Sequence, residues 1–397
     1  MKITEIRTYL MQAGPPAMLR DDGKAHAWHK SARNWLFVKI FTDEGITGIG
    51  ECSGWPRVIE RAVEDLARIL IGEDPAHIER LWQKMHCAIQ GHGMTGVVGS
   101  GAMAGLDMAL WDIKGKALNT PVWNLLGGKV RSRVPIYTHA KDVETALAMQ
   151  ARGIGAVKLG GVRDLVTRVA AIREAAGPDL DIMVDLAGPP WLTAADAIAL
   201  ARALEPHDLL FVEDPVPPEM ASQYGRLRGH VATPLAAGER MSTIWGMKDL
   251  IERELVDVIQ PDTGRAGGLT QMKKISAMAE AHGIMVAPHS GSLGPVAEFA
   301  AMHLMAAIPN ALMIERVEND WSGRNEVITA APICEDGHLV VPDAPGLGVG
   351  IVEEEVAKYP SFGNVGLGGA GQYNPGTEEE RLYVQTRLGR RKLIGRG

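Results

Sequence analysis

The run DIMVD at residues 181–185 has an apolar centre and ends in a carboxylate. Five later segments have the same form, four ending in a carboxylate and one in a histidine: LLFVE 209–213, PLAAGE 234–239, VDVIQPD 256–262, IMVAPH 284–289 and ALMIE 311–315. The last residues of the six runs are Asp185, Glu213, Glu239, Asp262, His289 and Glu315. Successive members lie roughly 25 residues apart, the length of a buried strand, a crossover helix and two loops. The series therefore predicts βα units with one polar residue at each strand end.

Two segments upstream extend the rhythm to eight units. VPIYTHA 134–140 reads as the first strand, and GAVK 155–158, which ends in Lys158, reads as the second. The connecting segments have helical periodicity, as in TAADAIALARAL 193–204. In a closed parallel barrel all strands open on one face, so the polar residues are expected to meet there. We predict a (β/α) barrel over residues 131–318.

The first 130 residues have a different pattern. Three segments alternate apolar and polar residues, namely MKITEIRTYL 1–10, NWLFVKIFTD 34–43 and GITGIGEC 45–52. The turn signal DEG at 43–45 joins the last two, which predicts an antiparallel meander. Helical periodicity follows over 58–72 and 77–89, and a helix rich in small residues is expected from about Val97 to Leu118. Residues 1–130 are therefore expected to form an α+β capping domain.

Composition limits the class of protein. The net charge of −7 offers no basic face for nucleic acid, and no apolar run is long enough to span a bilayer. Three cysteines without metal-type spacing (Cys52, Cys87 and Cys334) read as reduced thiols. We therefore expect a cytoplasmic protein with a small-molecule substrate, without a nucleic-acid or membrane partner, and assembled as a homo-oligomer.

Two loops of the capping domain are candidate lids. Residues 11–33 are too long for an ordinary hairpin connection and carry basic residues and histidines, including Arg20 and His29. Gly54-Trp55-Pro56 follows the third strand. We expect one or both loops to close over the barrel, with Arg20, His29 and Trp55 contacting substrate; the alternative is a mobile surface loop.

The end of the chain departs from the barrel rhythm. Residues 319–360 contain HLVVPDAPGLGVGI, which reads as a strand followed by a loop rich in proline and glycine, and this segment is expected to return to the capping domain. Residues 361–397 are rich in glycine and then in arginine. We interpret them as a flexible or oligomer-contacting tail rather than as an anion-binding segment.

The carboxylates of three consecutive strands suggest a metal site. Asp185, Glu213 and Glu239 offer oxygen ligands without a nearby thiol or imidazole, which suits Mg²⁺. Taken singly, each carboxylate is equally well explained as a helix N-cap or a loop charge. A polar residue that ends each of six apolar strands is costly unless it is solvated, paired or metal-bound, so the repetition favours function.

His289 ends a later strand and Asp262 ends the strand between. A carboxylate on an imidazole fixes its tautomer and raises its basicity, which makes His289 a candidate general base. A base and a metal ion on one barrel face predict abstraction of a proton next to a metal-bound carboxylate.

At this point the chain resembles the enolase superfamily, mandelate racemase subgroup, over roughly residues 1–355. The motifs that carry the resemblance are GIGEC 48–52, ALWDIKGKALNTPVWNLLGG 109–128, VEDP 212–215, AGER 237–240, QPDTGRAGGLT 260–270 and APHSGS 287–292, together with Asp185. The resemblance implies Mg²⁺ ligands at Asp185, Glu213 and Glu239, a catalytic dyad of His289 and Asp262, and a hydrogen bond from Glu315 to the oxyanion of the substrate.

The chain departs from the family pattern at the second and third strands. Where the family has Lys-x-Lys, this chain has Lys158-Leu159-Gly160, and Gly160 leaves the place of the second base empty. Ala187 stands where an asparagine is common. Both departures favour a reaction with one base, and the resemblance is nearest to acid-sugar dehydratases of the rhamnonate type.

We therefore expect a Mg²⁺-dependent dehydratase that converts an aldonate or aldarate into a 2-keto-3-deoxy acid. Lys158 is expected to contact the substrate carboxylate or to support the site electrostatically, with a base role as the alternative. Tyr137 and His139, at the end of the first strand, are expected to contact substrate hydroxyls, or else to be ordinary rim residues.

Three other functions are compatible with the sequence. An epimerase, racemase or cycloisomerase on the same scaffold would share the metal site. A phosphosugar isomerase would use the turn at 290–294 as a phosphate nest, although three carboxylates facing a phosphate disfavour it. A binding protein without catalysis is the third alternative.

Overall fold

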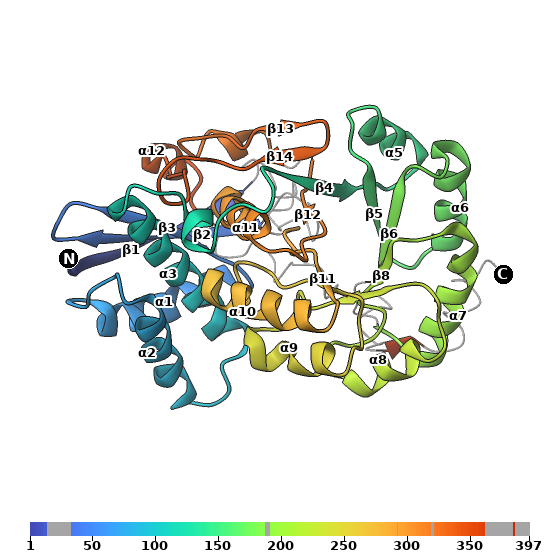
Figure 1. Cartoon of the computed structure of the whole chain (residues 1–397), viewed down its shortest axis with the longest axis horizontal. Coiled ribbons are helices and arrows are strands. Elements are labelled where there is room, and N and C mark those ends of the chain that lie inside the picture. The colour runs from blue at the N-terminus through green and yellow to red at the C-terminus, as the bar shows by residue number, and fades with distance from the viewer. Residues whose placement is uncertain (14–32, 187–190, 292, 319–320, 362–383, 386–397) are drawn as a thin grey trace, which may run out of the picture.

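The structure is a computed structural model that describes residues 1–13, 33–186, 191–291, 293–318, 321–361 and 384–385. It consists of a capping domain and a barrel that lie side by side (Figure 1). Within the described residues, none of the helices has the length and apolar character needed to cross a membrane.

The capping domain is an antiparallel sheet covered by helices. Its strands are β1 (Ile3–Ala13), β2 (Arg33–Thr42) and β3 (Thr47–Cys52), paired in that order. Gly45 closes the turn between β2 and β3 at a φ of 78°, which a residue with a side chain adopts only with strain. The helices are α1 (Pro56–Leu70), α2 (Ile78–Gln90), α3 (Gly96–Ala117) and the short α4 (Val122–Leu125). The predicted meander is confirmed.

The small residues of β3 and α3 explain how closely these elements pack. A Cβ atom at Gly48 or Gly50 would collide with the backbone carbonyl oxygens of Ala109 or Gly105 in α3. Strand and helix therefore meet backbone to backbone, and most of α3 is buried, as its composition predicts.

The second domain is a closed barrel of eight parallel strands. They are β4 (Arg133–His139), β5 (Ala156–Gly160), β6 (Asp181–Asp185), β8 (Phe211–Glu213), β9 (Leu235–Ala237), β10 (Val258–Ile259), β11 (Met285–Val286) and β12 (Ile314–Glu315). Strand β12 pairs with β4, and a parallel bridge from Val286 to Ala311 joins β11 to the start of β12. The sheet therefore closes, and the predicted barrel is confirmed.

In the part of the chain that the structure describes, seven helices surround the barrel. They are α5 (Val143–Gln150), α6 (Leu165–Ala176), α7 (Ala194–Leu204), α8 (Ala221–Arg228), α9 (Thr243–Glu252), α10 (Gly268–Ala281) and α11 (Pro295–Ala307). Among the described residues β12 is followed instead by the hairpin β13 (Cys334–Glu335) and β14 (His338–Val340), whose second strand pairs antiparallel with β4. A two-residue strand β7 (Trp191–Leu192) lies between β6 and α7. The helices α10 and α11 lie on the side that faces the capping domain (Figure 1).

A layer of apolar side chains fills the barrel below the strand ends. Each strand, or a residue directly beside it, contributes one member: Tyr137, Ala156, Met183, Phe211, Ala236, Val258, Ala287 and Met313. Because alternate residues of a strand face the same way, Lys158 lies two residues beyond Ala156 on the interior face. This apolar layer forms the barrel interior directly below the polar residues at the barrel mouth.

The C-terminal part of the chain, described for residues 321–361 and 384–385, contacts both domains. The Nζ atom of Lys39 in β2 lies 2.5 Å from Oε1 of Glu353 in α12 (Glu353–Val356), and Met11 forms a bridge with Pro360. Farther along, β15 (Val384–Gln385) pairs in parallel with β7. The domain boundaries and the role assigned to the tail stay predictions, and most of the tail lies outside the described residues.

Candidate active site

The barrel gathers the predicted strand-end residues into one buried polar network at its mouth. The side chain of Lys158, which is 2% exposed, occupies the centre of one half of this network. Its Nζ atom lies 2.8 Å from Oε2 of Glu213, 2.8 Å from Oε1 of Glu315 and 3.8 Å from Oδ2 of Asp185. Burial alone would lower the pKa of Lys158, but Glu213 and Glu315 raise it well above its usual value. The lysine is therefore a fixed positive charge shared by three carboxylates.

Glu213 is a predicted metal ligand with one carboxylate oxygen that has no partner among the described residues. Its side chain is fully buried, and its Oε1 atom has no hydrogen-bond partner among the described residues. Burial, opposed by Lys158 and reinforced by Asp185, Glu315 and Glu239, raises the pKa of Glu213 well above its usual range. A second cation at Oε1 would relieve both the missing contact and the repulsion.

The carboxylates do not form a ready-made metal shell in this structure. Within the described ranges, no three carboxylate, imidazole or thiol groups converge in a way that could hold an ion. Protein cations engage them instead, with Lys158 on Glu213, and with Arg240 and His289 on Glu239. The donor set is still that of a hard cation, and the unpartnered Glu213 oxygen fits Mg²⁺.

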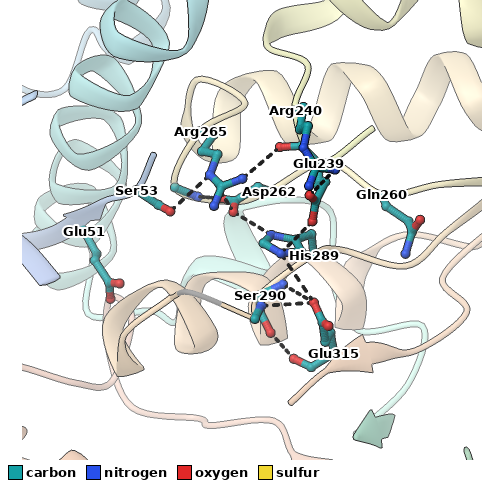
Figure 2. A network of polar contacts seen from close by, with 12 residues as sticks. Glu51, Ser53, Glu239, Arg240, Gln260, Asp262, Arg265, His289, Ser290 and Glu315 are labelled. Carbon is teal, nitrogen blue, oxygen red and sulfur yellow. Dashed lines mark hydrogen bonds and ion pairs between the residues drawn. The ribbon is translucent and has the colours of Figure 1, made fainter. Parts of the chain in front are cut away.

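The predicted dyad is present. The Nδ1 atom of His289 lies 2.8 Å from Oδ2 of Asp262, and its Nε2 atom lies 2.8 Å from Oε2 of Glu239 (Figure 2). Burial would lower the pKa of His289, but Glu239, Glu315 and Asp262 raise it to about 10. Asp262 thus holds the proton on Nδ1, and Nε2, which lies against Glu239 in this structure, is the nitrogen for proton transfer once Glu239 has another partner.

Glu315 is held by donors on several sides. The backbone N–H groups of Ser290 and Gly291 donate to its Oε2 atom at 2.8 and 3.0 Å, and His139 Nε2 lies 2.7 Å from its Oε1 atom. Burial would raise the pKa of Glu315, but Lys158, His289 and His139 hold it well below its usual range. An ionised carboxylate only accepts hydrogen bonds, so Glu315 needs a proton before it can donate one to an oxyanion.

The same contacts contradict the phosphate-nest alternative. A phosphate at the turn after His289 would need the N–H groups of Ser290 and Gly291, and both already donate to Glu315. The turn therefore anchors a carboxylate of the site.

Two arginines that the sequence analysis did not single out complete the network. Arg240 pairs with Asp214 and lies 2.5 Å from Oε1 of Glu239, and its guanidinium lies over the ring of Trp191. Arg265 Nε lies 3.2 Å from Oδ2 of Asp262 (Figure 2). Their positions in the sequence could have identified these two arginines, because Arg240 directly follows Glu239 and Arg265 lies three residues after Asp262.

The residues expected to contact substrate have different positions. His139 is partly exposed at the mouth, beside Glu315. Tyr137 is not a rim residue: it is fully buried in the barrel layer, with its ring 5.4 Å from Lys158 Nζ. Its position supports the lysine from below. Trp55 is half-exposed at the start of α1, two residues after Ser53, whose N–H donates to the carbonyl oxygen of Gly264.

Some of the predicted residues lie outside the part of the chain that the structure describes, whereas the predicted gap at Gly160 is present. Arg20, His29 and most of the loop 11–33 lie outside the described residues, as does Ala187. Gly160 lies opposite Asp185 in the sheet, and a Cβ atom built there meets no other atom within 4 Å. The place of a second base is therefore open space.

The sequence matches two family models. Residues 24–127 match the N-terminal domain of mandelate racemase and muconate lactonizing enzyme, and residues 141–356 match the enolase C-terminal domain-like family. The first match lies within the capping domain, and the second covers most of the barrel and continues beyond β12 into the C-terminal part.

Individual relatives extend this comparison over most of the chain. A D-galactonate dehydratase of Ralstonia pickettii (strain 12J) is 38% identical over 379 residues, which cover 89% of this chain and 93% of the relative. A D-galactonate dehydratase of Klebsiella pneumoniae (strain 342) is 39% identical over 359 residues, which cover 84% and 92%. The crystal structure of the 3,6-anhydro-D-galactonate cycloisomerase from Zobellia galactanivorans superposes with a TM-score of 0.81 at 34% identity, covering 91% of this chain and 100% of that chain.

The fold, the strand-end residues and these comparisons agree. Relatives of this identity and coverage make the chain an enzyme of the hydro-lyase class. The chain belongs to the enolase superfamily, in its mandelate racemase subgroup.

Proposed function

We propose that the protein is a Mg²⁺-dependent sugar-acid dehydratase that acts on an aldonate, with D-galactonate as the first substrate to test. The observation that carries the proposal is the Asp262–His289 dyad, which faces the carboxylate cluster around Lys158 across one barrel mouth. The relatives named D-galactonate dehydratase support the choice of substrate. The motifs alone suggested the rhamnonate type, which stays among the acids to be screened.

We assign Asp185, Glu213 and Glu239 as the ligands of Mg²⁺. Members of this superfamily generally use this ion. The buried Glu213 oxygen without a hydrogen-bond partner supports the assignment. When bound, Mg²⁺ would supply positive charge that favours the anionic form of the substrate.

The proton transfers belong to His289. Its Nε2 atom would take the proton from the carbon next to the substrate carboxylate, while Asp262 holds Nδ1–H. The imidazolium would then give this proton to the departing 3-hydroxyl group, which leaves as water. The enol that remains would become a 2-keto-3-deoxy acid by moving its hydroxyl proton to carbon 3.

Lys158 and Glu315 would position the substrate. The charge of Lys158 is fixed among its three carboxylates, which suits contact with the substrate carboxylate better than proton abstraction. His139, 2.7 Å from Glu315 and partly exposed, is placed to contact a substrate hydroxyl.

A second function is favoured by one comparison. The solved structure of a 3,6-anhydro-D-galactonate cycloisomerase covers nearly the whole chain. A cycloisomerase would use the same base and metal ligands but would release no water. The two functions therefore differ in the mass of the product.

The test is a screen of the purified full chain with Mg²⁺. D-galactonate, rhamnonate, other aldonates and aldarates, and an anhydro-aldonate are incubated separately. Mass spectrometry and a 2-keto acid assay follow the products. A 2-keto acid one water lighter than its substrate is expected. Consumption of the anhydro acid alone, without loss of mass, would favour the cycloisomerase, and no turnover of any acid would refute both functions.

A further inference from the structure

Two buried carboxylates of the capping domain reach across to the barrel. Glu51 is the penultimate residue of β3 and Asp107 lies in the middle of α3, and their side chains are 1% and 0% exposed. Neither is near the strand ends of the barrel in sequence. Both accept hydrogen bonds from backbone N–H groups at the start of a barrel helix.

Glu51 binds the start of α11. Its Oε2 atom accepts from the N–H of Ala297 at 3.0 Å, and its Oε1 atom accepts from the N–H of Gly294. Gly294 is the N-cap residue of α11 and provides no side chain for capping. The third residue of a helix has no N–H partner within the helix, and an N-cap side chain normally supplies it. Here Glu51 of the capping domain, which is labelled in Figure 2, supplies it.

Asp107 binds the start of α10 in the same way. Its Oδ2 atom accepts from the N–H of Thr270 at 2.9 Å, and its Oδ1 atom accepts from the Thr270 hydroxyl at 2.5 Å. Thr270 is the third residue of α10, and the N-cap residue Gly267 again offers no side chain. The indole of Trp82 adds a hydrogen bond of 2.8 Å to the Gly267 carbonyl oxygen.

Glycines make room for both carboxylates. A Cβ atom at Gly294 would lie 2.8 Å from Oε1 of Glu51, and one at Gly268 would lie 2.5 Å from Oδ2 of Asp107. Both distances are too short for a side chain. At Gly294, the N-cap of α11, a side chain is thus excluded by the carboxylate that replaces it. Gly268 is the first residue of α10, and at its N-cap, Gly267, a Cβ atom would lie 2.8 Å from Cγ of Gln271.

The two helices follow the two turns that carry the proposed dyad. Residues 262–267 connect Asp262 to α10, and their first turn is closed by the N–H of Gly264, which donates to Asp262 Oδ1 at 2.9 Å. Residues 289–294 connect His289 to α11. Fixing the start of each helix therefore fixes the far end of each short turn.

We infer that Glu51 and Asp107 are positioning residues that set the distance between Asp262 and His289 from the capping domain. The inference rests on the proposed function for the role of the dyad. Neither carboxylate touches the substrate. Each carboxylate acts through the start of one helix and the turn before it. The capping domain thereby holds the general base His289 and its partner Asp262 at a fixed distance from each other.

The competing explanation is that these acids only stabilise the fold, and Asp112 allows the two to be separated. Asp112 is also fully buried in α3, and it accepts from the N–H groups of Ile49 at 2.9 Å and Leu347 at 2.8 Å. It therefore joins the capping domain to the C-terminal part without contacting either dyad turn. Asp112→Asn is the matched control.

The experiment compares Glu51→Gln, Asp107→Asn and Asp112→Asn in the full chain with Mg²⁺. We expect Glu51→Gln and Asp107→Asn to lower kcat about 10²-fold, the loss typical of a small misplacement of reacting groups. KM should change little, because neither residue binds substrate. Asp112→Asn should lower the melting temperature but keep kcat.

Amide hydrogen exchange gives a readout that needs no substrate. Exchange should become faster over residues 293–299 in Glu51→Gln and over 263–271 in Asp107→Asn, each without an effect on the other segment. If the wild-type chain turns over no sugar acid, the proposed function fails, and hydrogen exchange still decides this inference.

Gly294→Ala covers the case in which Glu51→Gln does not fold. It keeps every buried carboxylate and only pushes a methyl group against Glu51, so it should lower kcat and loosen 293–299 in the same way. Unchanged kcat in the folded variants, an equal loss of kcat in Asp112→Asn, or faster exchange spread over the whole chain would overturn the inference.

Discussion

The Nε2 atom of His289 lies 2.8 Å from Oε2 of Glu239, so the proposed base and a proposed metal ligand hold each other. With Asp262 on the other ring nitrogen, the imidazole lies between two carboxylates. Such a histidine keeps its proton, in agreement with a pKa raised to about 10 by these partners against the effect of burial. His289 can act as a base only when Glu239 has another partner.

The first prediction concerns that partner. EDTA should abolish turnover and Mg²⁺ should restore it, because the buried Oε1 atom of Glu213 has no hydrogen-bond partner among the described residues and His289 stays bound to Glu239 until another cation replaces it. Glu213→Gln keeps the shape of the ligand and removes its charge, and it should lose activity beyond detection while still folding. The 2-keto acid assay measures both, and Glu219→Gln, at an exposed carboxylate, is the control. Full turnover in chelator would refute the metal assignment.

The second prediction concerns the base. His289→Asn should remove turnover and also the exchange of the substrate α-proton with D₂O, measured by NMR. A general base contributes on the order of 10² to 10⁴ in rate, so the loss should reach the detection limit. Exchange that persists in this variant would mean that Lys158 acts as a base on the other face, and the reaction would then be an epimerisation.

The barrel and its polar mouth could be predicted because both follow from local periodicity. An apolar run with a polar last residue, repeated at a regular interval, fixes the strand ends, and a parallel barrel brings them together. The contact of Asp262 with His289 required only this reasoning. The same reasoning places Lys158 at the barrel mouth, but its contact with Glu213 was not predicted, because Lys158 was expected to contact the substrate carboxylate or to support the site electrostatically.

The partners of these residues could not be predicted in the same way. Glu51 and Asp107 lie in the capping domain, and only the packing of the two domains shows which helix each one caps. Tyr137 was expected to contact a substrate hydroxyl, or else to be a rim residue, but its ring lies in the apolar layer of the barrel interior. The direction of a side chain at a strand end depends on where pairing stops, which the sequence does not state.

The third prediction concerns pH and Asp107. Burial raises its pKa from 3.8 to about 7, opposed by the hydrogen bonds of Thr270 and by Lys274 and reinforced by Glu79. The folded chain thus binds this proton more tightly than the unfolded chain. The resulting stability, about 4 kcal/mol, is fully present below the unfolded pKa and is lost as the pH rises through about 7.

Asp107→Asn tests this sign. Asparagine carries no proton that titrates, so the loss of unfolding free energy caused by the substitution should be larger at pH 5 than at pH 8. Urea unfolding at the two pH values measures it. A loss of unfolding free energy in Asp107→Asn that increases with pH would contradict the raised pKa of Asp107.

The fourth prediction concerns Trp55. Its side chain is 50% exposed beside the segment that binds Gly264, close to the turn of Asp262. If this loop covers bound substrate, Trp55→Ala should raise KM several-fold and change the melting temperature no more than its control does, because half of the side chain is exposed. Ile71→Ala, at a similarly exposed residue at the opposite end of α1, is the control. Equal KM values in the two variants would remove Trp55 from the substrate site.

The last prediction concerns the missing second base. Gly160 follows Lys158 by two residues on β5 and faces the same way, next to Asp185 on β6, and nothing within 4 Å blocks a Cβ atom there. Gly160→Lys should therefore fold, with a melting temperature close to that of the wild type.

The added amine would place a base on the face of the substrate opposite His289. We expect Gly160→Lys to exchange the α-proton of the substrate's C2 epimer with D₂O, which the wild-type chain should not do. Gly160→Met has a side chain of similar length without a base, so it separates the amine from the effect of bulk. If the lysine and methionine variants exchange the epimer at the same rate, residue 160 does not reach the α-carbon, and the absence of a second base cannot explain why the reaction uses one face.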